Sequence, residues 1–186
     1  MDKIAVEKTD TKEKIADVFK KHFNYFGFKK TSVDEVAKEL KVSKKTIYQF
    51  FTSKEKIFYY IVSRVAGGIK TGIDKDLQKY NTEIDRLRQL IIKIFSESKI
   101  WLKNNDAFEF RYKYEIGSLA FKDAFEELLA RIVKSGMENG EFKQSSPEIK
   151  VRFIEGIISE GMDIISKNPD QEVVVDVIDS VLKILM

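Results

Sequence analysis

Three serines spaced about ten residues apart, Ser32, Ser43 and Ser53, restrict the fold of this chain more than any other feature. Each precedes a stretch with apolar residues at helical spacing, and serine is a favoured helix N-cap because its hydroxyl accepts from a free backbone N–H. The segment from Ser32 to Glu35 also has the spacing of a capping box. The caps predict helices over about residues 33–40, from residue 44 and from residue 54. Only about three residues separate the first two, and helices joined so tightly cross steeply, as in a helix-turn-helix.

The rest of the chain also follows a helical period, and no segment shows the alternation of a strand. One helix is expected before the caps, over about residues 11–26, starting from Asp10 or Thr11 and stopped by Gly27. The helix capped by Ser53 is expected to continue toward Leu77. Five more are expected at Glu83–Lys103, Ala107–Gly117, Phe121–Asn139, Glu148–Lys167 and Asp170–Met186, the last two starting from the pairs Ser146-Pro147 and Asn168-Pro169. The predicted fold is all-α, with about nine helices.

Charge divides the chain into two parts. Residues 1–56 carry fourteen lysines against nine acidic residues, a net charge of +5, whereas the remainder has a net charge of −2. A basic head on a near-neutral body is typical of nucleic-acid-binding proteins, although solvated lysine-rich helices give the same count. We expect two domains, a three-helix helix-turn-helix domain at residues 1–56 and a second helical domain at residues 57–186.

Composition argues against several other classes of protein. The chain has no cysteine, which excludes disulfides, thiolate metal sites and cysteine nucleophiles. No run of about 18 apolar residues occurs and the first ten residues are polar, so we expect a cytoplasmic protein with no membrane partner. His22 is the single histidine, and its place on an apolar helix face favours packing over catalysis. No GxxxxGK, GxGxxG or paired Glu-x-x-His motif occurs, so we expect no enzyme, catalytic residue, metal or cofactor.

The helix over residues 44–51 has one apolar and one polar side at 100° per residue. Lys45 and Gln49 lie at the centre of the polar side, and its margins are Lys44, Thr46 and Tyr48. Lysine donates to guanine or phosphate, glutamine pairs with adenine, and hydroxyl groups bind phosphate, as reading a major groove requires. An ordinary solvated helix face gives the same pattern when the helix is considered alone. The neighbouring caps favour DNA, because free amides at two further helix starts offer sites for phosphate.

Three runs of sequence, at residues 32–37, 42–51 and 53–57, together resemble the DNA-binding domain of the TetR family of repressors, over about residues 11–62. The resemblance implies a C-terminal ligand-binding and dimerisation domain and a double-stranded DNA operator. Lys41 and Lys45 stand where members of the family often carry glycine, so we expect Lys41 to hold a left-handed turn at some cost in strain. The implied DNA-binding residues are Ser32, Ser43, Lys44, Lys45, Thr46, Tyr48, Gln49 and Lys54, of which Ser32, Thr46, Tyr48 and Lys54 are expected at phosphates.

The same resemblance implies a ligand cavity in the body, and the chain has enough aromatic residues to line one. Packing in a core is the ordinary role of such rings, but a few suit an apolar pocket for a small apolar or aromatic effector. The candidate effector-binding residues are Trp101, Phe108, Tyr112, Phe121, Phe125 and Met162. The function that follows is a repressor released from a palindromic operator by its effector. The alternative is a helical protein-binding or scaffold module with a basic head and no effector.

Each of the last two expected helices carries a broad apolar stripe, with residues at i, i+3, i+4, i+7, i+8 and i+11. One helix pair can bury such stripes internally, but their width suits pairing with a second copy in a four-helix interface. A homodimer sets two recognition helices about 34 Å apart, which predicts a palindromic operator. The expected interface residues are Ile154, Ile157, Ile158, Gly161, Ile165, Val174, Val177, Ile178, Val181 and Leu185.

Overall fold

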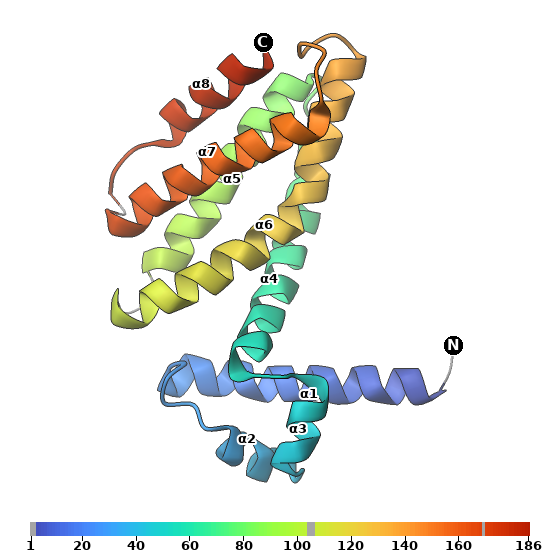
Figure 1. Cartoon of the computed structure of the whole chain (residues 1–186), viewed down its shortest axis with the longest axis vertical. Coiled ribbons are helices and arrows are strands. Elements are labelled where there is room, and N and C mark those ends of the chain that lie inside the picture. The colour runs from blue at the N-terminus through green and yellow to red at the C-terminus, as the bar shows by residue number, and fades with distance from the viewer. Residues whose placement is uncertain (1–2, 104–106, 169) are drawn as a thin grey trace. The chain divides into compact units, whose positions relative to one another are not determined.

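The computed structural model describes the backbone of residues 3–103, 107–168 and 170–186, and the side chains of residues 9–99, 116–168 and 170–186. Every regular element in these ranges is a helix, which confirms the all-α prediction (Figure 1). Eight helices are described in place of about nine. They are α1 (Lys3–Phe26), α2 (Val33–Leu40), α3 (Lys44–Phe50), α4 (Lys54–Leu77), α5 (Glu83–Lys103), α6 (Ala107–Glu138), α7 (Pro147–Lys167) and α8 (Val174–Leu185).

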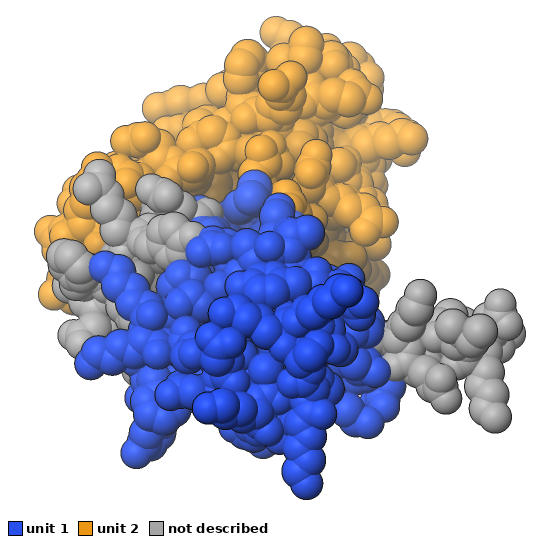
Figure 2. Space-filling view, turned by 60° about the horizontal axis from the view of Figure 1, so that its bottom comes forward, with its two compact units in different colours: residues 1–66, 107–120 blue, residues 67–106, 121–186 orange. Residues whose placement is uncertain are grey.

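The helices form two compact units (Figure 2). The first comprises residues 1–66 and 107–120, and the second comprises residues 67–106 and 121–186. Helix α4 continues past residue 66 and α6 continues past residue 120, so each of these helices contributes to both units. The domain boundary expected after residue 56 therefore falls inside α4.

Two helices run longer than the sequence predicts. Helix α1 begins at Lys3, not near Thr11, because residues 3–10 contain neither proline nor glycine, and Asp10 pairs with Lys14 one turn later at 2.5 Å. Helix α6 replaces two expected helices. Its interior includes Gly117, but a glycine weakens a helix by only about 1 kcal/mol relative to alanine, and no proline adds to that cost.

The start of α8 is also later than expected. The pair Asn168-Pro169 was expected to begin this helix, but Asn168 instead ends α7, with its N–H donating to the carbonyl of Ile164 at 3.0 Å. Pro169 lies outside the described residues. Helix α8 begins at Val174. A proline after a helix is equally suited to follow its C-terminus, so the dipeptide alone does not distinguish an end from a start.

Phenylalanine rings form the core of the first unit. The ring of Phe23 lies 5.5 Å from that of Phe19, 5.2 Å from that of Phe28 and 5.7 Å from that of Phe58, between centroids. All four side chains are buried. They come from α1, from the loop after it and from α4, so burial of these rings holds the three segments together.

The core of the second unit brings α5, α7 and α8 into close contact at Gly161 of α7. A Cβ atom at this position would lie 2.7 Å from the Val177 side chain of α8 and 2.8 Å from the Phe95 ring of α5. Both neighbours are buried. The glycine is therefore required for three helices to approach one another at this distance.

This packing involves many of the residues expected at the dimer interface. Some residues expected at the dimer interface are buried, or in close contact with their neighbours, within the single chain. They are Ile154, Gly161, Ile165, Val177, Val181 and Leu185. Those that stay half-buried are Ile157, Ile158, Val174 and Ile178. The apolar stripes thus serve first to join α7 and α8 to each other and to α5. The apolar side chains that α7 and α8 expose are different ones, Ile149, Phe153 and Val175 among them.

Replacing Gly161 with alanine is expected to lower the free energy of unfolding by about 1–3 kcal/mol, because the added methyl group overpacks a site bounded by two buried side chains. Denaturant unfolding followed by circular dichroism measures this change. Gly72→Ala in α4 is the matched control, since open space surrounds that position and alanine favours a helix. Equal stability of the two variants would show that the close approach at Gly161 is not a constraint.

Candidate functional site

The turn between α2 and α3 has the geometry that the serine caps predict. The Ser32 hydroxyl accepts from the N–H of Asp34 at 3.2 Å, and the Ser43 hydroxyl accepts from the N–H of Thr46 at 3.0 Å. Lys41 has φ 55° and ψ 39°, which confirms the expected left-handed conformation. Its N–H donates to the carbonyl of Lys38, and the next N–H donates to that of Ala37, closing a Schellman motif. The chain therefore leaves α2 and enters α3 within three residues.

Helix α3 buries Ile47 and exposes its opposite side. Lys45 and Gln49 are exposed there, as the helical period predicts. Tyr48 is 42% exposed beside them. Thr46 is half-buried, and its hydroxyl lies 2.8 Å from that of Ser43. The structure thus brings a cation, an amide and a phenol together on one solvent-facing surface, which we call the α3 face.

Lys44 begins α3 and is not free. Its ammonium donates to the Asp34 carboxylate of α2 at 2.9 Å. This hydrogen bond raises the pKa of Lys44 above its ordinary value. The two residues are ten positions apart and lie on different helices, so no spacing rule for a single helix indicates the pair.

Lys54, which the sequence suggests as a phosphate contact, makes several contacts within the first unit. Its ammonium donates to the carbonyls of Phe28 at 2.7 Å, Lys29 at 3.3 Å and Thr31 at 3.2 Å, all in the loop between α1 and α2. It also lies 4.6 Å from the centroid of the Phe28 ring. The charge is satisfied inside the unit, so the side chain joins the start of α4 to the loop that precedes α2.

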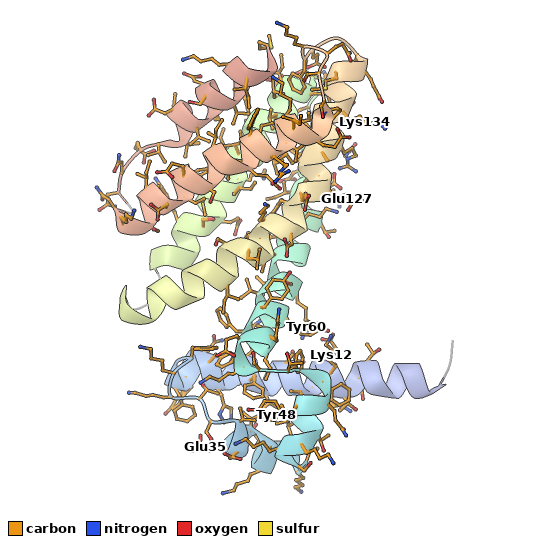
Figure 3. All side chains as sticks on the ribbon, in the orientation of Figure 1. Lys12, Glu35, Tyr48, Tyr60, Glu127 and Lys134 are labelled. Carbon is orange, nitrogen blue, oxygen red and sulfur yellow. The ribbon has the colours of Figure 1, made fainter. Side chains whose placement is uncertain are left out.

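A second polar connection, which the sequence does not indicate, joins α1 to α4. Arg64 pairs with Glu13 at 2.7 Å and with Asp17 at 2.9 Å, and the Tyr60 hydroxyl donates to Glu13. This hydrogen bond raises the pKa of Tyr60. Lys12 lies 4.2 Å above the Tyr60 ring (Figure 3). These side chains connect the first turns of α4 to α1, the helix against which the helix-turn-helix packs.

Half of the candidate effector residues are described. Phe125 is buried, and Phe121 is half-buried and stacks on it with centroids 6.1 Å apart and planes inclined by 17°. Met162 of α7 is half-buried. The side chains of Trp101, Phe108 and Tyr112 lie outside the described residues.

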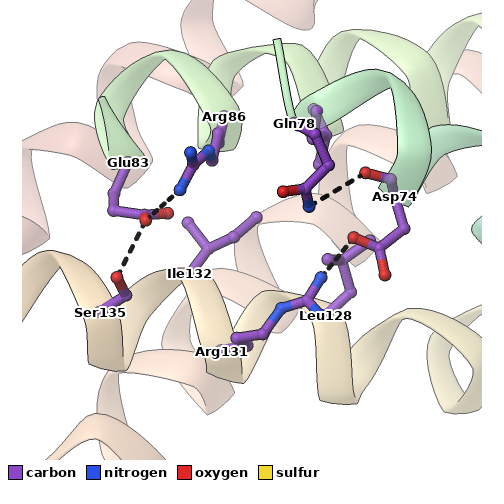
Figure 4. A pocket seen from close by; sticks show the side chains of 9 residues that line it. Asp74, Gln78, Glu83, Arg86, Leu128, Arg131, Ile132 and Ser135 are labelled. Atoms are coloured by element: carbon purple, nitrogen blue, oxygen red, sulfur yellow. Dashed lines mark hydrogen bonds and ion pairs between the residues drawn. The ribbon is translucent and has the colours of Figure 1, made fainter. Parts of the chain in front are cut away.

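A polar hollow of about 230 Å³ lies among α4, α5 and α6 in the second unit (Figure 4). Asp74 and Arg131 pair on one side, and Glu83 accepts from Arg86 at 2.5 Å and from Ser135 at 2.9 Å on the other. Two acids and two bases that neutralise each other give the lining no net charge with which to select a charged ligand. Its residues come from three separate helices, and no sequence pattern indicates the hollow.

Two other kinds of site are not found in the part of the chain that the structure describes. None of its helices is long and apolar enough to span a membrane. No group of three or more histidine, cysteine, aspartate or glutamate side chains among those described is arranged to hold a metal ion.

The sequence of the first unit matches a family of known regulators. Residues 17–61 match the model of bacterial regulatory proteins of the tetR family, a stretch that includes all of α2 and α3. The chain therefore carries a DNA-binding domain of the TetR family. It is thus a transcription regulator with a helix-turn-helix DNA-binding domain.

Similarity to known regulators extends beyond that domain. This chain is 27% identical over 150 residues to the HTH-type transcriptional regulator YhgD of Bacillus subtilis strain 168, covering 75% of this chain and 76% of YhgD. The structure of RolR with resorcinol matches with a TM-score of 0.75 at 11% identity, over 97% of this chain and 90% of RolR. Thermus thermophilus FadR with lauroyl-CoA matches with a TM-score of 0.66 at 20% identity, over 93% and 92%. Both structures share the fold of this chain.

Lys54→Met is expected to lower the free energy of unfolding of this regulator by about 1–3 kcal/mol, because hydrogen bonds from a charged group to carbonyls are lost. Thermal and denaturant unfolding measure the loss. Lys56→Met, an exposed position in the same turn, is the control. If Lys54→Met keeps full stability but binds DNA with a shallower salt dependence, the phosphate role suggested by the sequence is correct and the structural role is wrong.

Proposed function

We propose that this regulator is a repressor that binds a palindromic DNA operator as a homodimer and is released by a small apolar or aromatic effector. The observation that carries the proposal is the α3 face, where Lys45, Tyr48 and Gln49 are exposed on one side of a helix whose other side is buried. A helix held at a steep angle to its neighbour by a three-residue turn can enter a major groove.

Each part of the surface supports a different kind of DNA contact. Lys45 and Gln49 lie at the centre of the α3 face, where donors and an acceptor meet base edges. Ser43, Thr46 and Tyr48 carry hydroxyl groups suited to phosphate, and the start of α2 after Ser32 adds backbone amides. The net charge of +5 over residues 1–56 adds sequence-independent attraction to the phosphate backbone.

Dimerisation is supported by apolar side chains that α7 and α8 leave in solvent. Ile149, Phe153 and Gly156 follow one another at i, i+4 and i+7 on α7, and all three are exposed. Val175 is exposed on α8. Exposed apolar residues on a helix suit an interface, and the open space around Gly156 lets a second helix approach closely. The half-buried residues Ile157, Ile158, Val174 and Ile178 extend this surface.

An apolar or aromatic effector is supported by the stacked rings of Phe121 and Phe125, with Met162 as a third candidate. Two structures with the same fold contain ligands with an aromatic or apolar part, resorcinol in RolR and lauroyl-CoA, which has an apolar acyl chain, in Thermus thermophilus FadR. Release from DNA requires that the effector favour one of two arrangements of the protein. Helix α4 suits the transmission of that change, because it contributes residues to both units and its first turns are tied to α1 by Tyr60 and Arg64.

Lys45→Ala is expected to weaken binding to the operator by about 1–3 kcal/mol, roughly 5- to 150-fold, and to lower the slope of log K against log salt by about 0.9 if the lysine meets phosphate. Fluorescence anisotropy with DNA that flanks the coding region, and with a random fragment of equal length, measures both quantities. Lys183→Ala on α8 is the control of equal charge change. A parent protein that prefers neither DNA would contradict the repressor and favour the protein-binding alternative.

Phe153→Glu is expected to weaken dimerisation by about 2 kcal/mol or more, roughly thirtyfold in dissociation constant, because a charge replaces a large apolar group in the proposed interface. Sedimentation velocity across a dilution series measures the monomer fraction. The control is Leu119→Glu on α6, where the side chain is 52% exposed against 58% for Phe153. An unchanged monomer fraction in the Phe153 variant would place the interface elsewhere.

A further inference from the structure

The ion pair between Asp34 and Lys44 places an acid directly at the proposed DNA-binding surface. The carboxylate oxygen and the ammonium nitrogen are 2.9 Å apart, and the two side chains are 62% and 49% exposed. Lys44 is the first residue of α3, next to Lys45 of the α3 face. A negative charge is unfavourable beside the phosphates that such a surface meets. The position of Asp34 therefore has a cost for DNA binding.

The effects of Asp34 and Lys44 on the stability of their own helices account for only part of why the two residues are paired. Asp34 lies in the first turn of α2, where a negative charge interacts favourably with the helix dipole, but Glu35 supplies the same charge in the same turn. The charge of Lys44 interacts unfavourably with the dipole of α3, because a cation lies at the start of that helix. Its pairing with Asp34 offsets this cost in the free protein.

The ammonium of Lys44 has three donors but a single positive charge, part of which Asp34 already neutralises. Lys44 is charged at neutral pH, as an ordinary lysine is, and its ammonium suits a phosphate as well as a carboxylate. A phosphate that approaches the start of α3 must displace the carboxylate or leave the pair intact. In either case, the net gain from neutralising phosphate is smaller than for an unpaired lysine.

We propose that Asp34 is a specificity-determining residue, which holds Lys44 in an internal pair and so reduces the affinity of the regulator for DNA of any sequence. The proposal rests on DNA binding through the α3 face. Phosphate contacts supply nearly all of non-specific binding, whereas base-edge contacts carry the sequence preference. Lys45 and Gln49 are outside the pair, so Asp34 lowers the contribution of phosphate contacts more than that of base-edge contacts. The ratio of operator affinity to random-DNA affinity rises as a result.

The test compares Asp34→Asn with Glu35→Gln, because both remove one negative charge from adjacent exposed positions of α2 and only the first releases Lys44. Binding to an operator fragment and to a random duplex of equal length is measured by fluorescence anisotropy from 50 to about 300 mM salt. Asp34→Ser, which also suits a helix start, serves as a second variant, and circular dichroism confirms the helix content. Lys44→Ala and the double variant with Asp34→Asn complete a thermodynamic cycle.

Asp34→Asn is expected to raise the affinity for random DNA about three- to tenfold at 100 mM salt, and to steepen the salt slope by up to about 0.9. The operator affinity rises less, so the specificity ratio falls. Glu35→Gln gives a smaller change in affinity and no loss of specificity. In the Lys44→Ala background, Asp34→Asn behaves like Glu35→Gln.

Three outcomes separate this inference from the proposed function. Equal effects of Asp34→Asn and Glu35→Gln in the parent background would overturn the inference, since general electrostatics would then suffice. If Lys44→Ala leaves binding unchanged while Lys45→Ala weakens it, Lys44 does not reach DNA, and the inference fails while the proposed function stands. If the parent binds neither DNA, the proposed function itself fails.

Discussion

One ammonium group holds the loop that leads into the helix-turn-helix. Lys54 donates to three carbonyls of the loop between α1 and α2, while the Phe28 ring below it belongs to the aromatic core. A loop whose carbonyls converge on one cation cannot move without leaving a partly buried charge unsatisfied. Helix α2 begins directly after this loop, and α3 follows it within three residues. The exposure of the α3 face is therefore determined at the first turn of α4.

Features that depend on a few neighbouring residues are those the sequence predicts well. The Ser32, Ser43 and Ser146 caps form, α5 has its expected bounds, and Lys41 takes the left-handed conformation. Each is decided by one hydrogen bond or one backbone angle within a short segment. The apolar stripes of α7 and α8 are predicted equally well as stripes. The surface that covers these stripes is not predicted, because the period of a stripe identifies only the face that is buried.

The candidate site divides in the same way. The polar side of α3 follows from the helical period alone, and its exposure agrees with the prediction. The roles of Lys54 and Lys44 depend on groups that the fold brings from other helices, a set of loop carbonyls in one case and Asp34 in the other. A lysine has the same reach toward a carbonyl, a carboxylate or a phosphate, so its residue type does not decide among them. The groups that the fold places around each lysine decide its partner.

The left-handed lysine at position 41 has a consequence for the chain before it folds. A side chain in this conformation costs roughly 1 kcal/mol in the native state, but a glycine in its place gives the unfolded chain more conformations to lose, at a similar entropic cost. The two effects nearly cancel. The turn can therefore hold a charged residue with little net effect on stability, and evolution can vary the charge beside the α3 face without changing the path of the backbone.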